Sequence, residues 1–195
     1  MKISQLISAF ALSLTLTACV VPTGPVEVTR FNRVADGYVY GNGSYVATPA
    51  KAGDALSLSP YLAAVAREMQ RVGYSEKLSN SDVIAEVSVA ARKVEGAQRS
   101  PVSVGVGGST GSYGSGVGVG LGFDIGALGN KDRVETTLSV RLLRRADNLV
   151  IWEGRAVQSA GATSPAAQPG IAASKLAAAL FDDFPGKSGD VVTVP

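Results

Sequence analysis

Apolar residues alternate with polar ones in several stretches of the chain, and this repeat predicts β-strands with one covered face. The clearest stretches are residues 26–31, 82–94 and 134–143. Residues 149–157 follow the last of these after the turn-forming run Arg145-Ala146-Asp147-Asn148, so the two stretches predict a hairpin. Residues 36–49 contain valines and tyrosines that favour a strand, but Gly41-Asn42-Gly43 predicts a turn or bulge within them.

Two other stretches have the repeat of an amphipathic helix. The first begins with Ser59 as N-cap and Pro60 in the first turn, and Gly73 stands where a C-terminal glycine belongs, which predicts a helix of about 13 residues. Its apolar stripe consists of Leu62, Val65, Ala66, Met69 and Val72. The second has Pro165 and Pro169 flanking its start and is stopped by Pro185. Its stripe consists of Ala173, Leu176, Ala177, Leu180 and Phe184.

The order of these elements predicts the fold class. We expect an α+β domain with a mostly antiparallel sheet, two helices packed on one face, and a glycine-rich hairpin or loop. The chain has 195 residues, 46% of them hydrophobic, which suits one domain. We assign this domain to residues 26–186, with a glycine-rich insert at 101–130, and interpret residues 187–195 as a tail.

The glycine-rich stretch 105–122 invites a phosphate-binding interpretation, which its details exclude. A P-loop needs a lysine directly after its last glycine, and the chain has no lysine between Lys93 and Lys131. The spacing of a dinucleotide-binding loop is absent as well. Two arms with apolar residues at every second position, 102–106 and 117–123, instead predict a flexible hairpin. It is either a simple connection or a surface for another backbone or a membrane.

The first 18 residues resemble a bacterial secretory signal. Lys2 precedes an apolar run over residues 3–16, which is too short for a membrane span of about 20 residues. Leu16, Thr17, Ala18 and Cys19 then match a lipobox, in which the cysteine thiol accepts lipid. Cys19 is the single cysteine of the chain. We therefore expect a signal peptide at 1–18, lipidation at Cys19, and a lipidated tether at 19–25.

Lipidation predicts where the protein resides. Several acyl chains at about 0.8 kcal/mol per buried methylene make a stable membrane anchor. By resemblance to known lipoprotein sorting, Val20 in place of an aspartate favours the outer membrane, with the domain facing the periplasm. The expected partner is the lipid bilayer, through acylated Cys19, together with an envelope protein or glycan.

Charge and composition narrow the function classes. Without Lys2, the part after the signal has 17 of the 18 basic side chains against 16 acidic ones, so it is nearly neutral and no nucleic-acid partner is expected. The chain contains no histidine, which excludes Ser-His-Asp and Cys-His catalysis and the usual His/Cys zinc sites. We expect no catalytic residues, no metal site and no cofactor.

Carboxylates are the remaining candidates for acid–base chemistry. Their spacing singles out no pair, so the favoured interpretation is solvated or ion-paired side chains. The pair Asp182-Asp183 opposes the dipole of the second helix. We interpret it as capping or solvent-facing, with Lys187 as the candidate partner, and a bound cation or a basic partner is the alternative. The carboxylates considered are Asp82, Glu86, Asp124, Glu135, Glu153, Asp182 and Asp183.

Four arginines gather around the predicted hairpin: Arg141, Arg144, Arg145 and Arg155. They are candidates for contact with anionic lipid headgroups or phosphates. The favoured alternative is an exposed strand face that these charges keep from pairing edge to edge. Trp152 is expected to anchor the core, and Gly154 to leave room for a neighbouring aromatic ring.

Several local motifs occur in a characteristic order: the Gly-aromatic pair Gly73-Tyr74, Asp82 opening a strand, the glycine-rich middle, Trp152-Glu153-Gly154, and Phe184-Pro185. In these motifs the sequence resembles the bacterial lipoproteins known as domain of unknown function 4136. The resemblance covers most of residues 26–186 and implies a periplasm-facing lipoprotein of α+β fold. It implies no reaction.

The expected function is that of a membrane-anchored envelope lipoprotein whose domain is a non-enzymatic binding or structural module. Two alternatives remain. One is a carboxylate-based glycan hydrolase, which needs a cleft with two carboxylates about 5–10 Å apart. The other is an oligomeric, membrane-associated assembly that uses the glycine hairpin.

Overall fold

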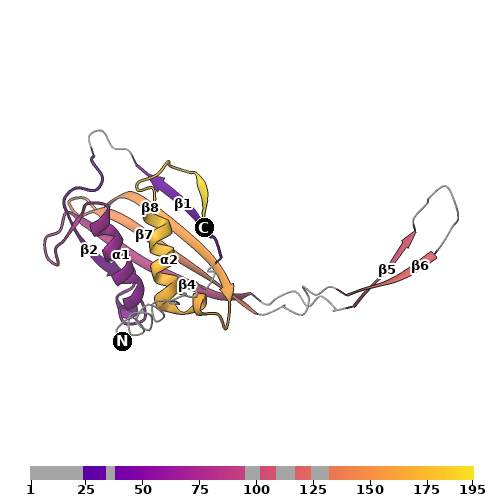
Figure 1. The fold of residues 1–195 in the computed structure, drawn as a ribbon. Coiled ribbons are helices and arrows are strands. Elements are labelled where there is room, and N and C mark those ends of the chain that lie inside the picture. The colour runs from indigo at the N-terminus through magenta and orange to yellow at the C-terminus, as the bar shows by residue number, and fades with distance from the viewer. Residues whose placement is uncertain (1–23, 34–37, 95–101, 109–116, 124–131) are drawn as a thin grey trace, which may run out of the picture.

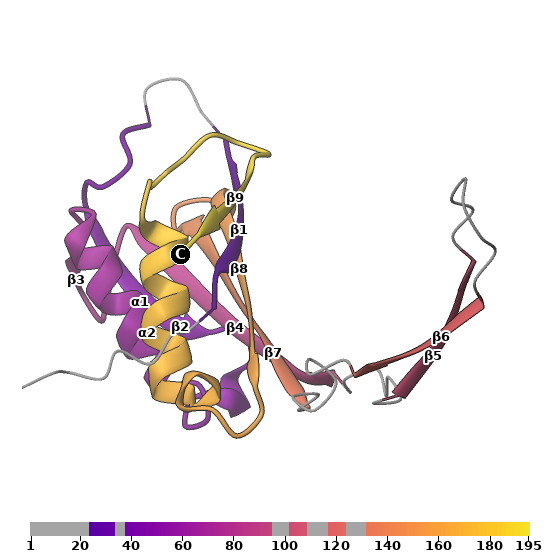
Figure 2. The same ribbon diagram turned by 45° about the vertical axis from the view of Figure 1, so that its right-hand side comes forward.

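The computed structural model describes residues 24–33, 38–94, 102–108, 117–123 and 132–195. Within these ranges the chain forms a seven-stranded sheet, a separate two-stranded sheet, and the helices α1 (Ser59–Arg71) and α2 (Pro169–Phe181). Both helices lie on the same face of the larger sheet (Figures 1 and 2). The order across that sheet is β3 (Ser75–Glu76), β2 (Ser44–Pro49), β4 (Val83–Val94), β7 (Arg133–Arg144), β8 (Leu149–Gly161), β1 (Val26–Asn32) and β9 (Val191–Val194).

The sheet is mixed, so the expectation of a mostly antiparallel sheet is wrong. β2 runs parallel to both of its neighbours, with Ser44 opposite Ser75 and Tyr45 opposite Val83. The reason is the crossover through α1, which carries the chain back along the sheet, so that the strands after it start at the same end as β2. The strand signal at residues 44–49 was weak, and the parallel pairings depend on that strand.

The hairpin of β7 and β8 contains a bulge. Leu142 pairs with Trp152 but Leu143 pairs with Val150, so Ile151 has no partner in β7. Ile151 and Trp152 are therefore both buried although they are consecutive. The Ile151 carbonyl accepts hydrogen bonds from the Arg33 N–H at 2.9 Å and from the Tyr40 hydroxyl at 2.6 Å.

Trp152 anchors the core, as expected. Its ring is 1% exposed and stacks on Phe181, with 5.4 Å between the ring centroids, and its Nε1–H donates to the Pro185 carbonyl at 2.9 Å. Gly154 makes room for this ring, because a Cβ there would overlap the Trp152 indole and lie 2.8 Å from Leu180 Cδ1. This confirms the predicted role of Gly154.

A buried arginine holds the C-terminal end of α2 against β1. Arg30 is 4% exposed, and its Nε and Nη2 donate to the carbonyls of Leu180 and Ala179, each at 2.9 Å. These carbonyls lie in the last turn, where the backbone supplies few N–H donors, and the Asp182 N–H reaches the Ala179 carbonyl only at 3.4 Å. Burial lowers the pKa of Arg30, and the charges of Asp183 and Asp182 act in the opposite direction. The negative charges of Asp182 and Asp183 thus favour the charged form of the buried Arg30 side chain.

Strands also form in the expected tail and in the glycine-rich insert. Val191–Val194, within the expected tail 187–195, form the edge strand β9 and pair antiparallel with β1. In the glycine-rich insert, β5 (Val102–Gly108) and β6 (Val117–Phe123) pair antiparallel with each other, as the two predicted arms. They form the separate two-stranded sheet, which lies apart from the larger one in Figures 1 and 2.

The close fit at Gly154 makes a testable prediction. Gly154→Ala is expected to lower the free energy of unfolding by about 1–3 kcal/mol, because the added methyl group overpacks the core. The measurement is urea denaturation. Gly170→Ala is the matched control, because a Cβ at Gly170 meets no atom within 4 Å. Equal effects of the two substitutions would contradict the assignment of Gly154 as a packing site.

Candidate binding cleft

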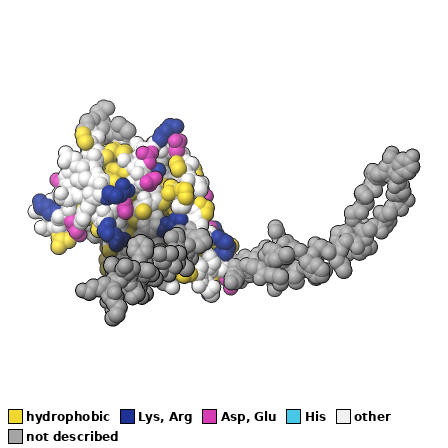
Figure 3. Space-filling view, viewed as in Figure 1, with side chains coloured by type: hydrophobic (Ala, Val, Ile, Leu, Met, Phe, Trp, Pro, Cys, Tyr) yellow, Lys and Arg dark blue, Asp and Glu magenta, His cyan; other side chains and the backbone are white. Residues whose placement is uncertain are grey.

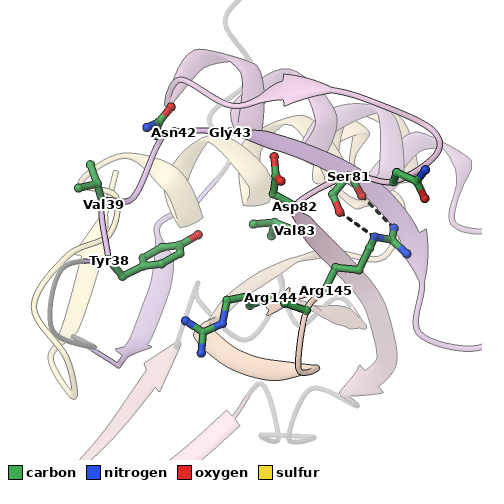
Figure 4. A pocket seen from close by; sticks show the side chains of 11 residues that line it. Tyr38, Val39, Asn42, Gly43, Ser81, Asp82, Val83, Arg144 and Arg145 are labelled. Atoms are coloured by element: carbon green, nitrogen blue, oxygen red, sulfur yellow. Dashed lines mark hydrogen bonds between the residues drawn. The ribbon is translucent and has the colours of Figure 1, made fainter.

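A cleft of about 640 Å³ opens at the end of the sheet where β2 and β4 begin and β7 ends. Three segments line it: the run that leads into β2, the run that leads into β4, and the turn after β7 (Figure 4). The parallel start of β2 and β4 is what brings the first two together. The lining residues are Tyr38, Val39, Asn42, Gly43, Asn80, Ser81, Asp82, Val83, Arg144, Arg145 and Ala146.

Ser44 and Asp82 join the first two segments. The Asp82 carboxylate oxygen Oδ2 accepts from the Ser44 N–H at 2.8 Å and from the Ser44 hydroxyl at 2.6 Å. In return, Ser44 Oγ lies 3.0 Å from the Asp82 N–H, which donates to it. The hydrogen bonds from Ser44 lower the pKa of Asp82 below its ordinary value. Asp82 is therefore an ionised carboxylate at neutral pH, fixed in position.

The turn before β2 is fixed against the end of α1 by close backbone contact. Gly73 ends the helix at φ 105° and Gly41 has φ 75°, and a Cβ on either would overlap the backbone of the other segment. Tyr74 follows, and burial together with its hydrogen bond to Tyr38 raises the pKa of its hydroxyl. The two hydroxyl oxygens lie 3.4 Å apart. The Gly-aromatic pair Gly73-Tyr74 thus positions Tyr38 at the cleft.

Hydrogen bonds to neighbouring residues hold the two arginine side chains of the cleft in place. Arg145 donates through Nε to the Ser81 carbonyl at 2.7 Å and through Nη2 to the Ser81 hydroxyl at 2.9 Å. Arg144 binds both carboxylate oxygens of Asp147, at 3.0 and 2.7 Å. In Figure 4, Arg144 lies toward Tyr38, whereas Arg145 points the other way, toward Ser81. The cleft therefore presents an aromatic ring, a carboxylate and two guanidinium groups on a fixed framework.

The four arginines singled out in the sequence divide between two surfaces. Arg144 and Arg145 line the cleft. Arg141 faces Glu86 at 3.4 Å on the side of the sheet away from the helices, where it alternates with the inward-facing Val140 and Leu142. Arg155 lies further along that side, at a groove that Glu135 also lines. The structure does not bring the four together.

The candidate carboxylates are likewise spread over different parts of the domain surface. Three of the candidates line three different hollows: Asp82 lines the cleft, and Glu135 and Glu153 each line a separate groove. Glu135 accepts from Arg92 Nε at 2.8 Å, which lowers the pKa of Glu135. Lys187 pairs with Asp190 at 3.3 Å. The negative charges of Asp182 and Asp183 raise the pKa of Arg30, against the effect of its burial. Asp124 lies outside the described residues.

Three further expectations concern the lipobox, a metal site and a membrane-spanning helix. Leu16, Thr17, Ala18 and Cys19 lie outside the described residues. Within the described ranges, no cluster of three or more acidic, cysteine or histidine side chains is arranged to hold a metal ion. Nor does any helix there have the length and apolar character to cross a membrane. On the face seen in Figure 3, basic and acidic side chains are interspersed.

Sequence reasoning did not identify Tyr38, Asn42, Ser44 or Asn80 as residues of a site. One signal was present: Gly41-Asn42-Gly43 was predicted as a turn, and turns carry binding residues more often than strands do. Asn80 has φ 51°, a left-handed conformation that asparagine tolerates. The sequence could not show that these turns meet, because this depends on the parallel register of β2 and β4.

Comparison with known proteins gives the family. The model of the domain of unknown function DUF4136 matches residues 27–186, which include both helices and the segments that line the cleft. The chain belongs to this family. The chain is also similar to an uncharacterized protein of Zymomonas mobilis, at 43% identity over 63 residues. That match covers 32% of the chain and 24% of the relative.

Two solved structures resemble the DUF4136 chain. A PDZ domain protein from Parabacteroides distasonis matches with a TM-score of 0.51 at 11% identity, over 88% of this chain and 39% of that one. This likeness concerns the fold alone. A PelC dodecamer from Paraburkholderia phytofirmans matches with a TM-score of 0.45 at 8% identity, over 84% of this chain and 99% of that one. A likeness at this level supports no functional argument.

The Ser44–Asp82 link predicts a specific pH dependence. Because the pKa of Asp82 is lowered in the folded chain, its contribution is present at neutral pH and is lost as the pH falls through the folded pKa, below about 4. Asp82→Asn is therefore expected to lower the melting temperature at pH 7, and the difference from the unsubstituted chain should shrink in acid.

Thermal melts over a pH series test this. A double-mutant cycle with Ser44→Ala isolates the pair from other carboxylates, and Asp190→Asn, which removes an exposed charge paired with Lys187, is the control. A Ser44–Asp82 coupling of the same size at pH 3 and pH 7 would contradict the account.

Proposed function

We propose that this DUF4136 protein is a lipid-anchored lipoprotein of the bacterial outer membrane, whose domain faces the periplasm and binds another envelope component. The observation that carries the anchor is the sequence Leu16-Thr17-Ala18-Cys19 directly after the short apolar run. Cys19 is also the single cysteine, so lipidation would leave no exposed thiol in an oxidising compartment.

The distance between the anchor and the domain fits this proposal. β1 begins at Val26, a few residues after Cys19, and the intervening segment contains Pro22 and Pro25, which favour an extended chain. A tether of this length would keep the domain close to the membrane surface. Its ligand is therefore sought among envelope components.

The cleft supports a binding role for the domain. Its volume lies within the range of about 300–1,000 Å³ that is usual for small-molecule sites, and the charged groups of Asp82, Arg144 and Arg145 are held by hydrogen bonds to neighbouring residues. Preorganised groups lose less entropy on binding than mobile ones. The envelope protein or glycan expected from the sequence would bind here.

The hydrolase alternative receives less support. Glycoside hydrolysis needs two carboxylates flanking one bond, about 5–10 Å apart. In the described part of the chain the cleft contains the single carboxylate of Asp82, which already accepts two hydrogen bonds from Ser44. A binding module is therefore preferred to an enzyme. No contact in the described part of the chain favours the oligomeric assembly over the binding module.

Cys19→Ala tests the anchor. The variant is expected to lose labelled palmitate and to leave the membrane fraction, because the acyl chains supply the membrane affinity. The measurement is metabolic labelling followed by fractionation of the envelope. Val20→Asp tests the sorting expectation, since it should move the lipidated protein from the outer to the inner membrane.

Asn42→Ala, an exposed substitution at the cleft, is the matched control and should remain with the outer membrane. The anchor proposal is wrong if the Cys19→Ala chain still fractionates with membranes to the same extent as the unsubstituted chain.

A further inference from the structure

The cleft defined above has features that select a class of ligand. We propose that it binds an uncharged sugar residue of a glycan. The proposal rests on the proposed function in one respect: the glycan is a component of the bacterial envelope. The inference itself depends on the shape, charge and hydrogen-bonding groups of the cleft.

The hydrogen-bonding groups suit hydroxyl ligands. Asn42 and Asn80 line the cleft and are exposed, and their amide side chains make no hydrogen bond to other described residues. Each amide offers two donor hydrogens and an acceptor oxygen. Asp82 engages Ser44 through Oδ2, which leaves Oδ1 as a further acceptor. A hydroxyl group both donates and accepts, so a polyhydroxylated ligand satisfies this mixture of groups.

The charges of the cleft disfavour an ionic ligand of either sign. Asp82 is an ionised carboxylate and repels an anion. Arg144 and Arg145 repel a cation, and their forks are partly occupied, by Asp147 and Ser81 respectively. A bidentate site for a phosphate or carboxylate would need an unoccupied fork. The balance favours a neutral molecule that takes single hydrogen bonds from the remaining N–H groups.

The cleft also has an apolar wall. The Tyr38 ring extends from the segment before β2 toward Asp82 and Val83 (Figure 4). Beside it, Val39 is 67% exposed, which is high for a large apolar side chain. A sugar ring has one face of C–H groups, which packs on the negative face of an aromatic ring, while its hydroxyls point to the edges. Tyr38 and Val39 offer that packing surface in the same cleft that the two amides line.

The wall is held in place before a ligand arrives. Tyr38 contacts the Tyr40 ring edge-to-face at 4.9 Å between centroids, and its hydroxyl lies 3.4 Å from that of Tyr74. Asn80 is placed by a left-handed backbone, with φ 51°, directly before Ser81 and Asp82. Asparagine tolerates this conformation, so the backbone presents the Asn80 amide at the cleft.

The test is a titration of the full lipidated chain, purified in detergent, with chitotetraose, a neutral oligosaccharide that carries hydroxyl and acetamido groups. Inorganic phosphate and an acidic peptide are titrated in parallel. We expect saturable binding of chitotetraose with a dissociation constant of about 1 mM or tighter, and no saturation by the other two probes.

Asn42→Ala and Tyr38→Ala are each expected to weaken this binding, the second by about tenfold or more. Asn42 is exposed and has no positive φ, so its substitution keeps the fold and decides the test if Tyr38→Ala does not fold. Phe31→Ala is the matched aromatic control, since Phe31 is 54% exposed on β1 and does not line the cleft. It should bind as tightly as the unsubstituted chain.

The proposal is overturned if chitotetraose does not saturate, if Asn42→Ala binds it as tightly as the unsubstituted chain, or if only phosphate or the acidic peptide binds. Cys19→Ala separates this outcome from that of the anchor. It should bind chitotetraose unchanged even where it has left the membrane, so loss of anchoring and loss of sugar binding are independent results.

Discussion

The candidate site depends on the pair of residues that joins the starts of two parallel strands. Ser44 opens β2 and Asp82 directly precedes β4, and hydrogen bonds run between them in both directions. Without the parallel register these residues would lie at opposite ends of the sheet. With it, three turns meet at one end, and the carboxylate that fixes two of them also faces the cleft. The same contact therefore serves structure and recognition.

The rest of the domain supplies the rigid base for this end. Trp152 fills the space that Gly154 leaves, and Arg30 holds the C-terminal turn of α2 on β1. Phe184 joins the two regions, because its ring packs on Trp152 at 5.2 Å and on Tyr40 at 5.6 Å between centroids. Tyr40 in turn contacts Tyr38, so an aromatic series runs from the core to the wall of the cleft.

The sequence predicted the elements that have strong local signals. Helix α1 was predicted from Pro60 and Gly73, and the β7–β8 hairpin from the turn at 145–148, because capping and turn residues act over a few positions. The direction of β2 was not predicted, since parallel pairing depends on contacts far apart in the chain. The strand β9 was missed for the same reason, because its partner β1 lies at the other end of the chain, and the bulge at Ile151 was missed as well.

The site was predictable only in part. Arg144, Arg145 and Asp82 were named as candidates, but in separate groups with Arg141 and the other carboxylates. The amides and the tyrosine of the cleft belong to no distinctive sequence motif. They form a site only because three turns meet at one end of the sheet. The anchor is the reverse case, because the lipobox is a local sequence signal and its four residues lie outside the described structure.

The central claim is that this end of the sheet recognises a ligand through its preorganised turns. The most direct measurement is mapping of backbone amide shifts by NMR during addition of purified, soluble envelope glycan fragments. The account predicts that the perturbed amides cluster at residues 38–44, 80–83 and 144–146. Perturbations confined to the face of the sheet that carries Arg141 and Arg155, or to β5 and β6, would contradict it.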